Sequence, residues 1–469
     1  MKRVAFITLG CKANWVDGEE LAAVCRRAGL AVVPFADEAD AYVVNTCTVT
    51  AVADQQSRQL LRRARRQNPG ALVVATGCLG EVDASAIEAI PEVDRVFGTS
   101  DRGEMLEYLF ERLGFEIGMV SLRGAAATKQ SLGVKEIASL PSVARNDSNE
   151  FFQSRARAFL KIQDGCDRHC AYCIVPRARG LARSVHAGEI VDSCIALSRH
   201  HREIVLTGID IGQYRDEECG DLPGLLERLL STDGLPRIRI SSIHPTVVDG
   251  RLLRFLSSPG KMCRHVHLSI QSCSDTVLKR MGRNYSADDV ARAVSSLVDA
   301  VPGIAVTCDL IAGFPGESEG DHRSTVSLLS SLPLAGLHVF PYSLRLGTRA
   351  AGMDGQVAPG ERRMRAAEIR TIGAEARRRF LDSFIGEALD VIVTSSEPDA
   401  DGAVSAFSDN AISIALPADI IGYGDMGRAI ITGASGLKAK GKWDSHQMKR
   451  RSSSASKSGS AINSSAGSI

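Results

Sequence analysis

The sequence contains no long apolar run, little net charge and few cysteines, and each shortage excludes a class of protein. No stretch approaches the roughly 18 apolar residues of a membrane helix, so we expect no membrane association. Lysine and arginine total 56 against 55 acidic residues, a formal net charge of +1, so any nucleic-acid surface must be local. Twelve cysteines in 469 residues are too sparse for a disulfide scaffold. We therefore expect a cytoplasmic protein of about two to four domains that uses thiols for metal or redox chemistry.

The amino terminus resembles a lipoprotein signal, because residues 9–11 read Leu-Gly-Cys. Its apolar stretch, residues 4–9, is shorter than the core of a normal signal peptide. We expect the first β-strand of a folded domain here instead.

Three cysteines stand close together in one short segment. Cys166, Cys170 and Cys173 form a C-x3-C-x2-C pattern directly after an apolar run at residues 158–162. Three thiols can hold one metal centre, and they are one short of the four thiolates that usually bind a 4Fe–4S cluster. Such a cluster keeps one iron open to a small molecule. A zinc site with His169 as a fourth ligand, or simple buried thiols, are the alternatives.

Three further cysteines follow short apolar runs near the amino terminus. Cys11, Cys47 and Cys78 each stand directly after such a run. Residues 1–117 alternate these runs with amphipathic stretches, which predicts a parallel α/β domain. Because the carboxyl ends of parallel strands share one edge of the sheet, where ligands bind, we infer a second three-thiolate site there. Any single buried thiol after a strand is commonplace.

Residues 155–375 repeat a strand-then-helix pattern, which predicts a partial (β/α)6 barrel. The expected strands are residues 158–162, 203–206, 238–242, 265–270, 304–313 and 337–342. Chemistry in such barrels gathers at the carboxyl ends of the strands. The loop of Cys166 follows the first strand, so we place it at this mouth.

The remaining segments predict a linker, a small barrel and a tail. Residues 118–154 lose periodicity and are typical of a linker. Residues 361–383 predict a basic amphipathic helix, and β-like runs within 386–437 predict a small β-barrel of a type that often binds RNA. Residues 438–469 are rich in serine and basic residues and are expected to be disordered. The chain is thus predicted to be an α/β protein with a small β-barrel near its carboxyl end.

Other candidate groups have ordinary structural explanations. A basic helical face at residues 59–67 is either solvated or in contact with RNA phosphates. His244 and His265 could line the barrel mouth, although a hydrogen-bonded structural histidine is commoner. The other cysteines are expected to be packing residues: Cys25, Cys194, Cys219, Cys263, Cys273 and Cys308.

The short cysteine loop matches the signature of radical S-adenosylmethionine enzymes, with the aromatic Tyr172 before its last cysteine. Residues 3–115, 155–375 and 386–437 together resemble the methylthiotransferases, which join a three-cysteine domain, a radical barrel and a small RNA-binding β-domain. The segments that carry the resemblance are TLGCKAN at 8–14, NTC at 45–47, TGC at 76–78, KIQDGC at 161–166, CRH at 263–265, LKRMGRNY at 278–285 and FPYSLRLGT at 340–348.

Within that family the sequence is most similar to the enzymes that methylthiolate threonylcarbamoyladenosine beside the anticodon of tRNA. Its markers include Lys12, the segment TGIDI at 207–211, and Arg345. Sister groups act on isopentenyladenosine in tRNA or on an aspartate of a ribosomal protein, and both remain alternatives. The sequence departs from the family's habit at Trp15 and Asp210, and at Cys273 as well.

The resemblance implies two 4Fe–4S clusters and S-adenosylmethionine as cofactors. The implied ligands are two sets of three: Cys166, Cys170 and Cys173, and Cys11, Cys47 and Cys78. The first set would serve the cluster that cleaves S-adenosylmethionine to a radical able to take hydrogen from C2 of the adenine, and the second set the cluster that carries sulfur. Tyr172, Gly208 and Gln271 are the expected S-adenosylmethionine contacts. The implied partners are tRNA and a one-electron reductant of the flavodoxin or ferredoxin type.

Two interpretations without this chemistry remain open. A zinc-bound RNA-binding module would explain the thiol loops and the basic helical face. A two-cluster electron carrier would explain the thiols, but it has little use for a barrel or an RNA-type domain. No general acid or base stands out in the sequence, as expected for radical chemistry.

Overall fold

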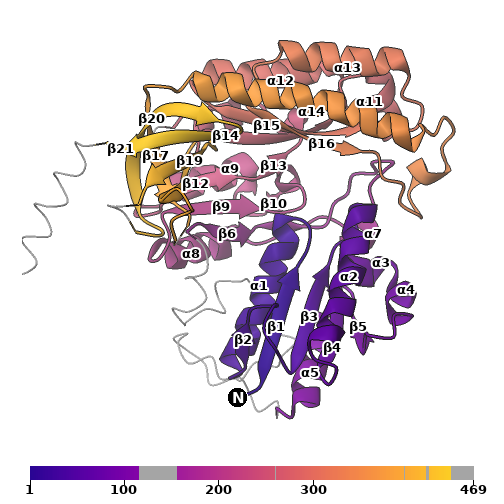
Figure 1. Cartoon of the computed structure of the whole chain (residues 1–469). Helices are drawn as coiled ribbons and strands as arrows, with labels where there is room; N and C mark the ends of the chain where they lie inside the picture. Colours follow the sequence, from indigo (N-terminus) through magenta and orange to yellow (C-terminus); the bar gives the residue numbers. More distant parts are fainter. Residues whose placement is uncertain (116–155, 259, 396, 419–421, 445–469) are drawn as a thin grey trace, which may run out of the picture.

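The computed structural model describes residues 1–115, 156–258, 260–395, 397–418 and 422–444. These residues form an α/β domain, an open α/β barrel and a small closed β-barrel, in that order (Figure 1). No helix among them is long and apolar enough to cross a membrane. The linker predicted at 118–154 lies outside the described residues, as does the predicted tail beyond residue 444.

The first domain is a parallel five-stranded sheet in the order β2-β1-β3-β4-β5. Its strands are β1 (Arg3–Thr8), β2 (Ala31–Val33), β3 (Ala41–Thr46), β4 (Leu72–Gly77) and β5 (Arg95–Val96). Its helices are α1 (Lys12–Arg27), α2 (Ala51–Gln67), α3 (Cys78–Val82), α4 (Ala84–Glu88) and α5 (Arg102–Leu113). Alternate strand residues enter separate apolar cores on the two faces, as Val43 and Val44 do. The strand order reverses between β1 and β3, which is where open α/β sheets bind ligands.

The second domain confirms the predicted open barrel of six strand positions. Two parallel sheets, β12-β9-β6 and β13-β14-β15-β16, are joined where β12 passes through Ser241 into β13. The strands are β6 (Ala158–Lys161), β9 (Glu203–Thr207), β12 (Arg237–Ile240), β13 (Ser242–Ile243), β14 (His265–Gln271), β15 (Ala305–Ala312) and β16 (Gly336–Pro341). Two short hairpins flank them, β7 (Gln163–Asp164) with β8 (Arg183–Ser184), and β10 (Arg215–Asp216) with β11 (Gly220–Asp221).

Helices cover the convex side of the barrel sheet (Figure 1). They are α8 (Ala187–Ser198), α9 (Leu222–Ser231), α10 (Gly250–Leu256), α11 (Asp275–Met281), α12 (Ala287–Ala300), α13 (Glu319–Ser331) and α14 (Pro359–Asp382). The short helix α7 (Val175–Arg179) lies instead beside α3 of the first domain (Figure 1). Short 3-10 turns are η2 (Ile211–Gln213), η3 (Pro245–Val247) and η4 (Arg349–Gly352). Strand β15 shows which side chains face the helices, because Val306, Cys308 and Leu310 pack in the core beneath them. The residues between them, Thr307 and Asp309, therefore face the concave side.

The third part is a closed barrel in the order β17-β18-β19-β21-β20. Its strands are β17 (Ala388–Val393), β18 (Ala403–Ser408), β19 (Ser413–Pro417), β20 (Met426–Ser435) and β21 (Lys438–Trp443). The prediction that the disordered tail starts at residue 438 was wrong, because β21 closes the barrel between β19 and β20. Its lysines are exposed while Ala439 and Trp443 are buried, and the Trp443 indole donates to the Pro417 carbonyl at 2.8 Å. This alternation is hard to recognise in the sequence, because three of the six residues of β21 are lysine.

The carboxyl ends of the first domain's strands face the open barrel (Figure 1). The Thr99 hydroxyl donates to the Ala178 carbonyl at 2.6 Å, and the Ala51 amide donates to the Ser343 hydroxyl at 3.0 Å. The rings of Trp15 and Phe159 meet edge to face, with centroids 5.2 Å apart. The loops that carry Cys11, Cys47 and Cys78 therefore lie at the interface between the two domains.

Candidate active site

The loop of Cys166, Cys170 and Cys173 follows β6 and β7 at the mouth of the barrel. It is fixed at its centre, because the Ala171 amide donates to the Met281 carbonyl and the Ala350 amide donates to the Ala171 carbonyl, both at 2.8 Å. Gly165 precedes the first cysteine with φ of +70°, and a Cβ there would lie 1.9 Å from the Leu181 carbonyl oxygen. Only glycine fits this turn without moving the backbone.

The sulfur atoms of this loop receive hydrogen bonds. Cys166 Sγ accepts from the Arg168 amide at 3.4 Å and from Gln213 Nε2 at 3.1 Å. Burial raises the pKa of Cys173 to about 12 and raises that of Cys166 as well, so both are neutral thiols in the absence of a metal. Coordination deprotonates such thiols, and N–H donors then stabilise the resulting thiolates.

The second set of thiols also converges, as the parallel sheet requires. Cys47 and Cys78 directly follow β3 and β4, and Cys11, the exposed member, comes three residues after the end of β1. A Cβ on Gly10 would lie 2.5 Å from Cys47 Sγ, so the backbone before Cys11 approaches the second thiol closely. Burial raises the pKa of Cys47 to about 12, and the neighbouring thiols Cys78 and Cys11 add to the rise.

A buried ionic cluster joins the two thiol sets. Arg179, at the end of α7, donates to Asp164 at 3.0 Å and to Asp17 at 2.9 Å, and both ends of the Arg179–Asp17 pair are 1% exposed. Burial raises the pKa of Cys78, and the positive charge of the same guanidinium opposes that rise. Lys161 and Arg102 also pair with Asp17. Sequence patterns do not indicate this cluster, because Asp17 meets Arg179 and Lys161 only when the two domains dock.

The sulfur atoms of neither cysteine set are as close together as they would be around a single zinc ion. Zinc–sulfur bonds of about 2.3 Å in a tetrahedron bring the sulfur atoms within about 3.8 Å of one another. Among the described residues, neither cysteine set has all its sulfur atoms within 4.8 Å of each other. Thiolates are the usual ligands of iron–sulfur clusters.

The predicted S-adenosylmethionine contacts lie on the same rim as the loop. The Tyr172 ring meets Phe314 edge to face at 6.3 Å. Gly208 follows β9, where a Cβ would lie 2.7 Å from the Gln163 carbonyl oxygen. Gln271 ends β14 with φ of +64°, a strained conformation for a residue other than glycine. The structure therefore brings these three residues to one mouth, and their contact with the cofactor stays a prediction.

Sequence reasoning missed two polar side chains that organise this rim. Gln163 Oε1 accepts from the Ile209 and Asp210 amides at 3.0 and 2.9 Å, while its amide nitrogen donates to the Gly165 carbonyl at 2.8 Å. The Gln213 side chain donates to Cys166 Sγ and so links η2 to the cysteine loop. Glutamine occurs in many structural contexts, so only the folded geometry identifies these two roles.

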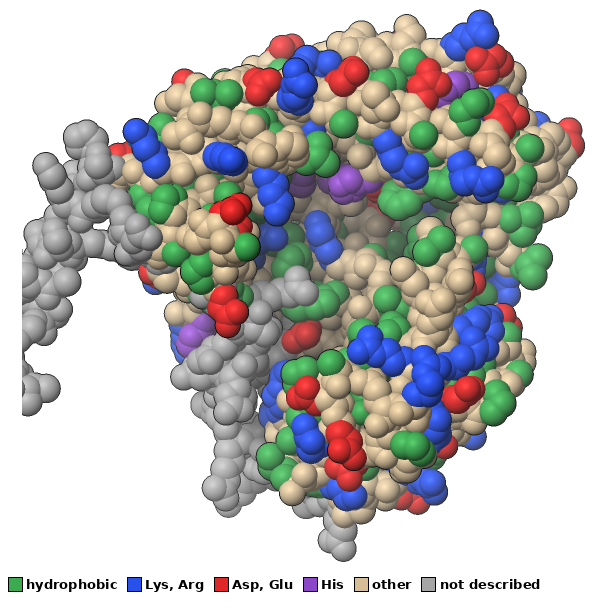
Figure 2. Space-filling view, in the orientation of Figure 1, with side chains coloured by type: hydrophobic (Ala, Val, Ile, Leu, Met, Phe, Trp, Pro, Cys, Tyr) green, Lys and Arg blue, Asp and Glu red, His purple; other side chains and the backbone are tan. Residues whose placement is uncertain are grey.

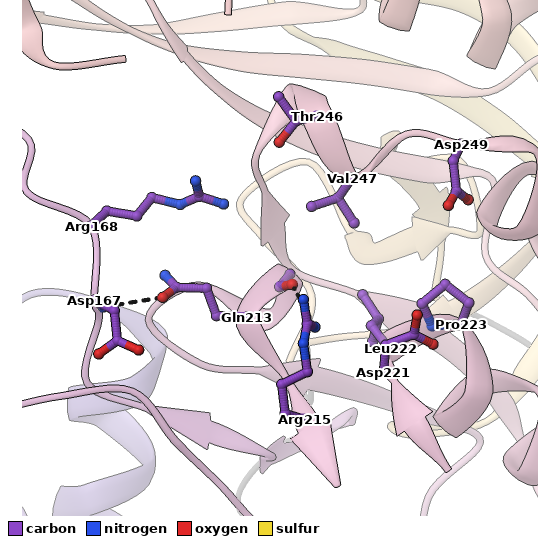
Figure 3. A pocket seen from close by; sticks show the side chains of 11 residues that line it. Asp167, Arg168, Gln213, Arg215, Asp221, Leu222, Pro223, Thr246, Val247 and Asp249 are labelled. Atoms are coloured by element: carbon purple, nitrogen blue, oxygen red, sulfur yellow. Dashed lines mark hydrogen bonds between the residues drawn. The ribbon is translucent and has the colours of Figure 1, made fainter. Parts of the chain in front are cut away.

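A pocket of about 490 Å³ opens beside the cysteine loop (Figure 3). Asp167 and Arg168 come from the loop itself, and the opposite wall is formed by segments around η2, β11 and η3. The Asp167 amide donates to Gln213 Oε1 at 3.1 Å, drawn as a dashed line in Figure 3. Arg168 also pairs with Asp210 at 2.6 Å. Gln213 lines this pocket and bonds Cys166, so its side chain would lie between Cys166 and a molecule bound here.

The remaining histidine and cysteine predictions concern structural residues. Burial lowers the pKa of His244 to about 2, and its Nδ1 lies 2.7 Å from the Thr246 hydroxyl, as expected for a hydrogen-bonded structural histidine. Cys273 and Cys308 are buried in the core under the helices, as is Cys194.

Two family descriptions match the chain. Residues 3–98 match uncharacterized protein family UPF0004, and residues 160–329 match the radical SAM superfamily. Threonylcarbamoyladenosine tRNA methylthiotransferase of Bacillus subtilis is 36% identical over 429 residues, which cover 90% of this chain and 92% of that protein. The protein of the same name from Aquifex aeolicus is 35% identical over 392 residues, 83% of this chain and 92% of that one. Ribosomal protein uS12 methylthiotransferase of Lachnoclostridium phytofermentans is 32% identical over 398 residues, 83% and 87% of the two chains.

A solved structure shares the fold at lower sequence identity. The radical S-adenosylmethionine methyltransferase TsrM from Kitasatospora setae, with cobalamin and a 4Fe–4S cluster bound, gives a TM-score of 0.53 at 15% identity. The alignment covers 75% of this chain and 74% of that chain. At this identity the likeness concerns the arrangement of helices and strands alone.

Proposed function

The chain belongs to the methylthiotransferase family of radical S-adenosylmethionine enzymes, and from that premise we propose that it adds a methylthio group to C2 of threonylcarbamoyladenosine in tRNA. The observation that carries the proposal is the pair of thiol sets at one domain interface, where Arg179 acts on Cys78 and also bonds Asp164, two residues before Cys166. A single electron-transfer centre would need only one of them. Sulfur insertion needs both a radical source and a sulfur site within reach of one target atom.

Each thiol set has its own role in this proposal. Cys166, Cys170 and Cys173 would hold the 4Fe–4S cluster that, when bound, supplies the electron for cleavage of S-adenosylmethionine. The other three cysteines would hold the sulfur-bearing cluster. Tyr172, Gly208 and Gln271 would position S-adenosylmethionine on the rim and exclude water from it. The chain's own residues therefore act by binding and orientation rather than by acid–base catalysis.

The tRNA would contact basic side chains on two separate parts of the chain. On α2, Arg62, Arg63 and Arg66 are exposed, whereas Arg65 is held by the Ala71 carbonyl at 2.6 Å and is not available. On the small barrel, β21 presents exposed lysines at 438, 440 and 442. Alternating exposed lysines on a closed β-barrel suit contact with RNA phosphates.

The proposal includes a site of action and an electron donor. A tRNA substrate supports a cytoplasmic site of action. The electron would come from a small reductant of the flavodoxin or ferredoxin type, because a radical enzyme of this class has no internal electron source.

Anaerobic metal analysis together with nucleoside analysis tests the proposal. Two clusters predict about eight irons and eight sulfides per chain. Replacing either cysteine set by alanine should leave about four of each, whereas the control Cys219→Ala should leave all eight. Zinc without sulfide would contradict the cluster assignment.

The two triple variants should also differ in their products. The chain without Cys11, Cys47 and Cys78 should still cleave S-adenosylmethionine but form no methylthio product. The chain without the other set should do neither. Mass spectrometry of digested tRNA identifies the product, and methylthiolation of isopentenyladenosine or of a ribosomal-protein aspartate instead would reassign the substrate.

A further inference from the structure

A hollow separates the open barrel from the first domain, and histidine and basic side chains line its upper wall (Figure 2). A polar row crosses the concave face of the barrel sheet here. His267 Nε2 lies 3.0 Å from Asp309 Oδ1, and His338 Nδ1 lies 3.4 Å from the same oxygen. The two imidazole rings have centroids 4.9 Å apart. We call His267, Asp309 and His338 the histidine row.

The histidine row is anchored at one end and open at the other. His267 Nδ1 lies 2.7 Å from the Thr307 hydroxyl, and the His267 side chain is 8% exposed. The side chains of Asp309 and His338 are 25% and 63% exposed, so the outer end of the row is accessible to a ligand. Because Asp309 is fixed between two imidazoles, its second oxygen is held in place for another donor.

The first domain supplies a lysine to the same hollow. Lys12 begins α1 directly after Cys11, and its closest charged surroundings include Arg157, Arg239 and Asp309. Within the described part of the chain, the Lys12 ammonium makes no hydrogen bond and no ion pair. Lys12 is exposed, so a ligand that enters the hollow can reach its ammonium.

Lys12 is the cation here that has no carboxylate partner among the described residues. Arg157, Arg237 and Arg239 pair with Glu203 at 2.7 to 3.3 Å. Asp309 lies between the two imidazoles of the histidine row. An anionic group that enters the hollow can therefore pair with Lys12 and hydrogen-bond the outer end of the histidine row.

We propose that Lys12 and the histidine row form the subsite for the threonylcarbamoyl substituent of the target adenosine. The inference rests on the proposed function. The substituent carries a carboxylate, a hydroxyl and carbamoyl N–H groups. Lys12 pairs with the carboxylate, and Asp309 and His338 hydrogen-bond the hydroxyl and the N–H groups. An isopentenyl group in the same place would leave these charged groups desolvated without partners, which gives the specificity its physical basis.

The subsite also explains how the ring is brought to the sulfur. Lys12 is the neighbour of Cys11, a residue assigned to the sulfur-bearing cluster. A substituent held by Lys12 therefore keeps the adenine close to the residue that would bind that cluster. Lys12 is thus a positioning residue that acts on the substrate's substituent and not on C2.

A comparison of two anticodon stem-loops on the cluster-loaded enzyme tests the subsite. One carries threonylcarbamoyladenosine, and the other carries its neutral methylamide. The variants are Lys12→Met, Lys12→Arg and His338→Phe, and Lys2→Met is the control because Lys2 lies before β1, at the opposite end of the strand from Cys11. Dissociation constants, KM, kcat and iron content are measured for each protein.

The wild-type enzyme should bind the acid stem-loop about tenfold or more tightly than the methylamide, because one charge-assisted contact is lost. Lys12→Met should abolish this preference and raise KM with full iron content, whereas Lys12→Arg and Lys2→Met should keep it. His338→Phe should weaken binding of both stem-loops.

Two results would overturn the subsite. One is an undiminished preference for the acid in Lys12→Met, and the other is an extra bound divalent metal that His338→Phe removes, which would make the histidine row a metal site. The proposed function fails separately. If the wild-type enzyme prefers the acid stem-loop but converts neither, the subsite stands and the reaction assignment is wrong.

Discussion

Glu203 offers the sharpest test of how the two barrels are held together. Its side chain is fully buried at the start of β9, and its carboxylate accepts from Arg237 Nε and Arg239 Nε, both at 2.7 Å. The same two arginines donate to the Phe407 and Ser408 carbonyls of the small barrel at 3.2 and 2.9 Å. Glu203 thus neutralises the cations that tie the small barrel to the large one.

Glu203→Gln should destabilise this junction by about 3 to 5 kcal/mol. The substitution keeps the shape but leaves the guanidinium groups of Arg237 and Arg239, which are 5% and 2% exposed, without their buried counter-charge. Urea unfolding under anaerobic conditions, followed by Trp443 fluorescence in a Trp15→Phe background, measures the loss. With a slope of about 1 to 3 kcal/mol per molar, the midpoint should fall by about 1 M or more.

The control is Glu227→Gln, whose side chain is 61% exposed on α9 and should change stability by less than about 0.5 kcal/mol. Equal midpoints for the two variants would refute the reasoning.

The pH dependence of the Glu203 effect follows from the direction of its pKa. Burial alone raises the pKa of Glu203, but the charges of Arg239 and Arg237 outweigh burial and hold the pKa below its ordinary value. A lowered folded-state pKa stabilises the fold fully above the unfolded-state value of about 4.3, and the stabilisation is lost as the pH falls toward the folded-state pKa. The difference between wild type and Glu203→Gln should therefore be constant from about pH 8 to 6 and shrink below about pH 4. A difference that changes between pH 8 and 6 would point to another titrating group.

Two further predictions concern RNA binding and the end of the small barrel. Replacing Arg62, Arg63 and Arg66 by glutamine should weaken tRNA binding and lower the slope of log Kd against log salt by about 2 to 3, measured by filter binding. An unchanged slope would mean that this face is merely solvated. A chain ended after Asp444 should resist protease as the full chain does, whereas one ended after Leu437 lacks β21 and should lose the small barrel. Equal resistance of the two truncated chains would contradict the role of β21.

Local pattern was sufficient for much of the fold. Apolar runs bounded by turn residues predict the six barrel strand positions and the first four strands of the small barrel. These strands can be predicted because the side chains of a strand alternate between its two faces, and this pattern is local in the sequence. The convergence of Cys11, Cys47 and Cys78 followed from one further rule, that parallel strands end at one edge. Strand β21 was not predicted, because its three lysines make the segment resemble a charged tail. The burial of Ala439 and Trp443 depends on strands that are distant in the chain.

Tertiary structure alone decided how the charged groups are used. Asp17 and Arg179 are far apart in sequence, and neither belongs to a motif, yet docking of the domains makes them one buried pair beside Cys78. Lys12 was noticed only as a family marker, whereas its unpaired ammonium in the hollow is a property of the docked domains.

The sequence by itself predicted both sets of thiols as metal ligands, since thiols a few residues apart share a loop and parallel strands end at one edge of a sheet. It did not determine which charges neutralise one another, because electrostatic energy depends on distance and burial, and both exist only in the folded chain.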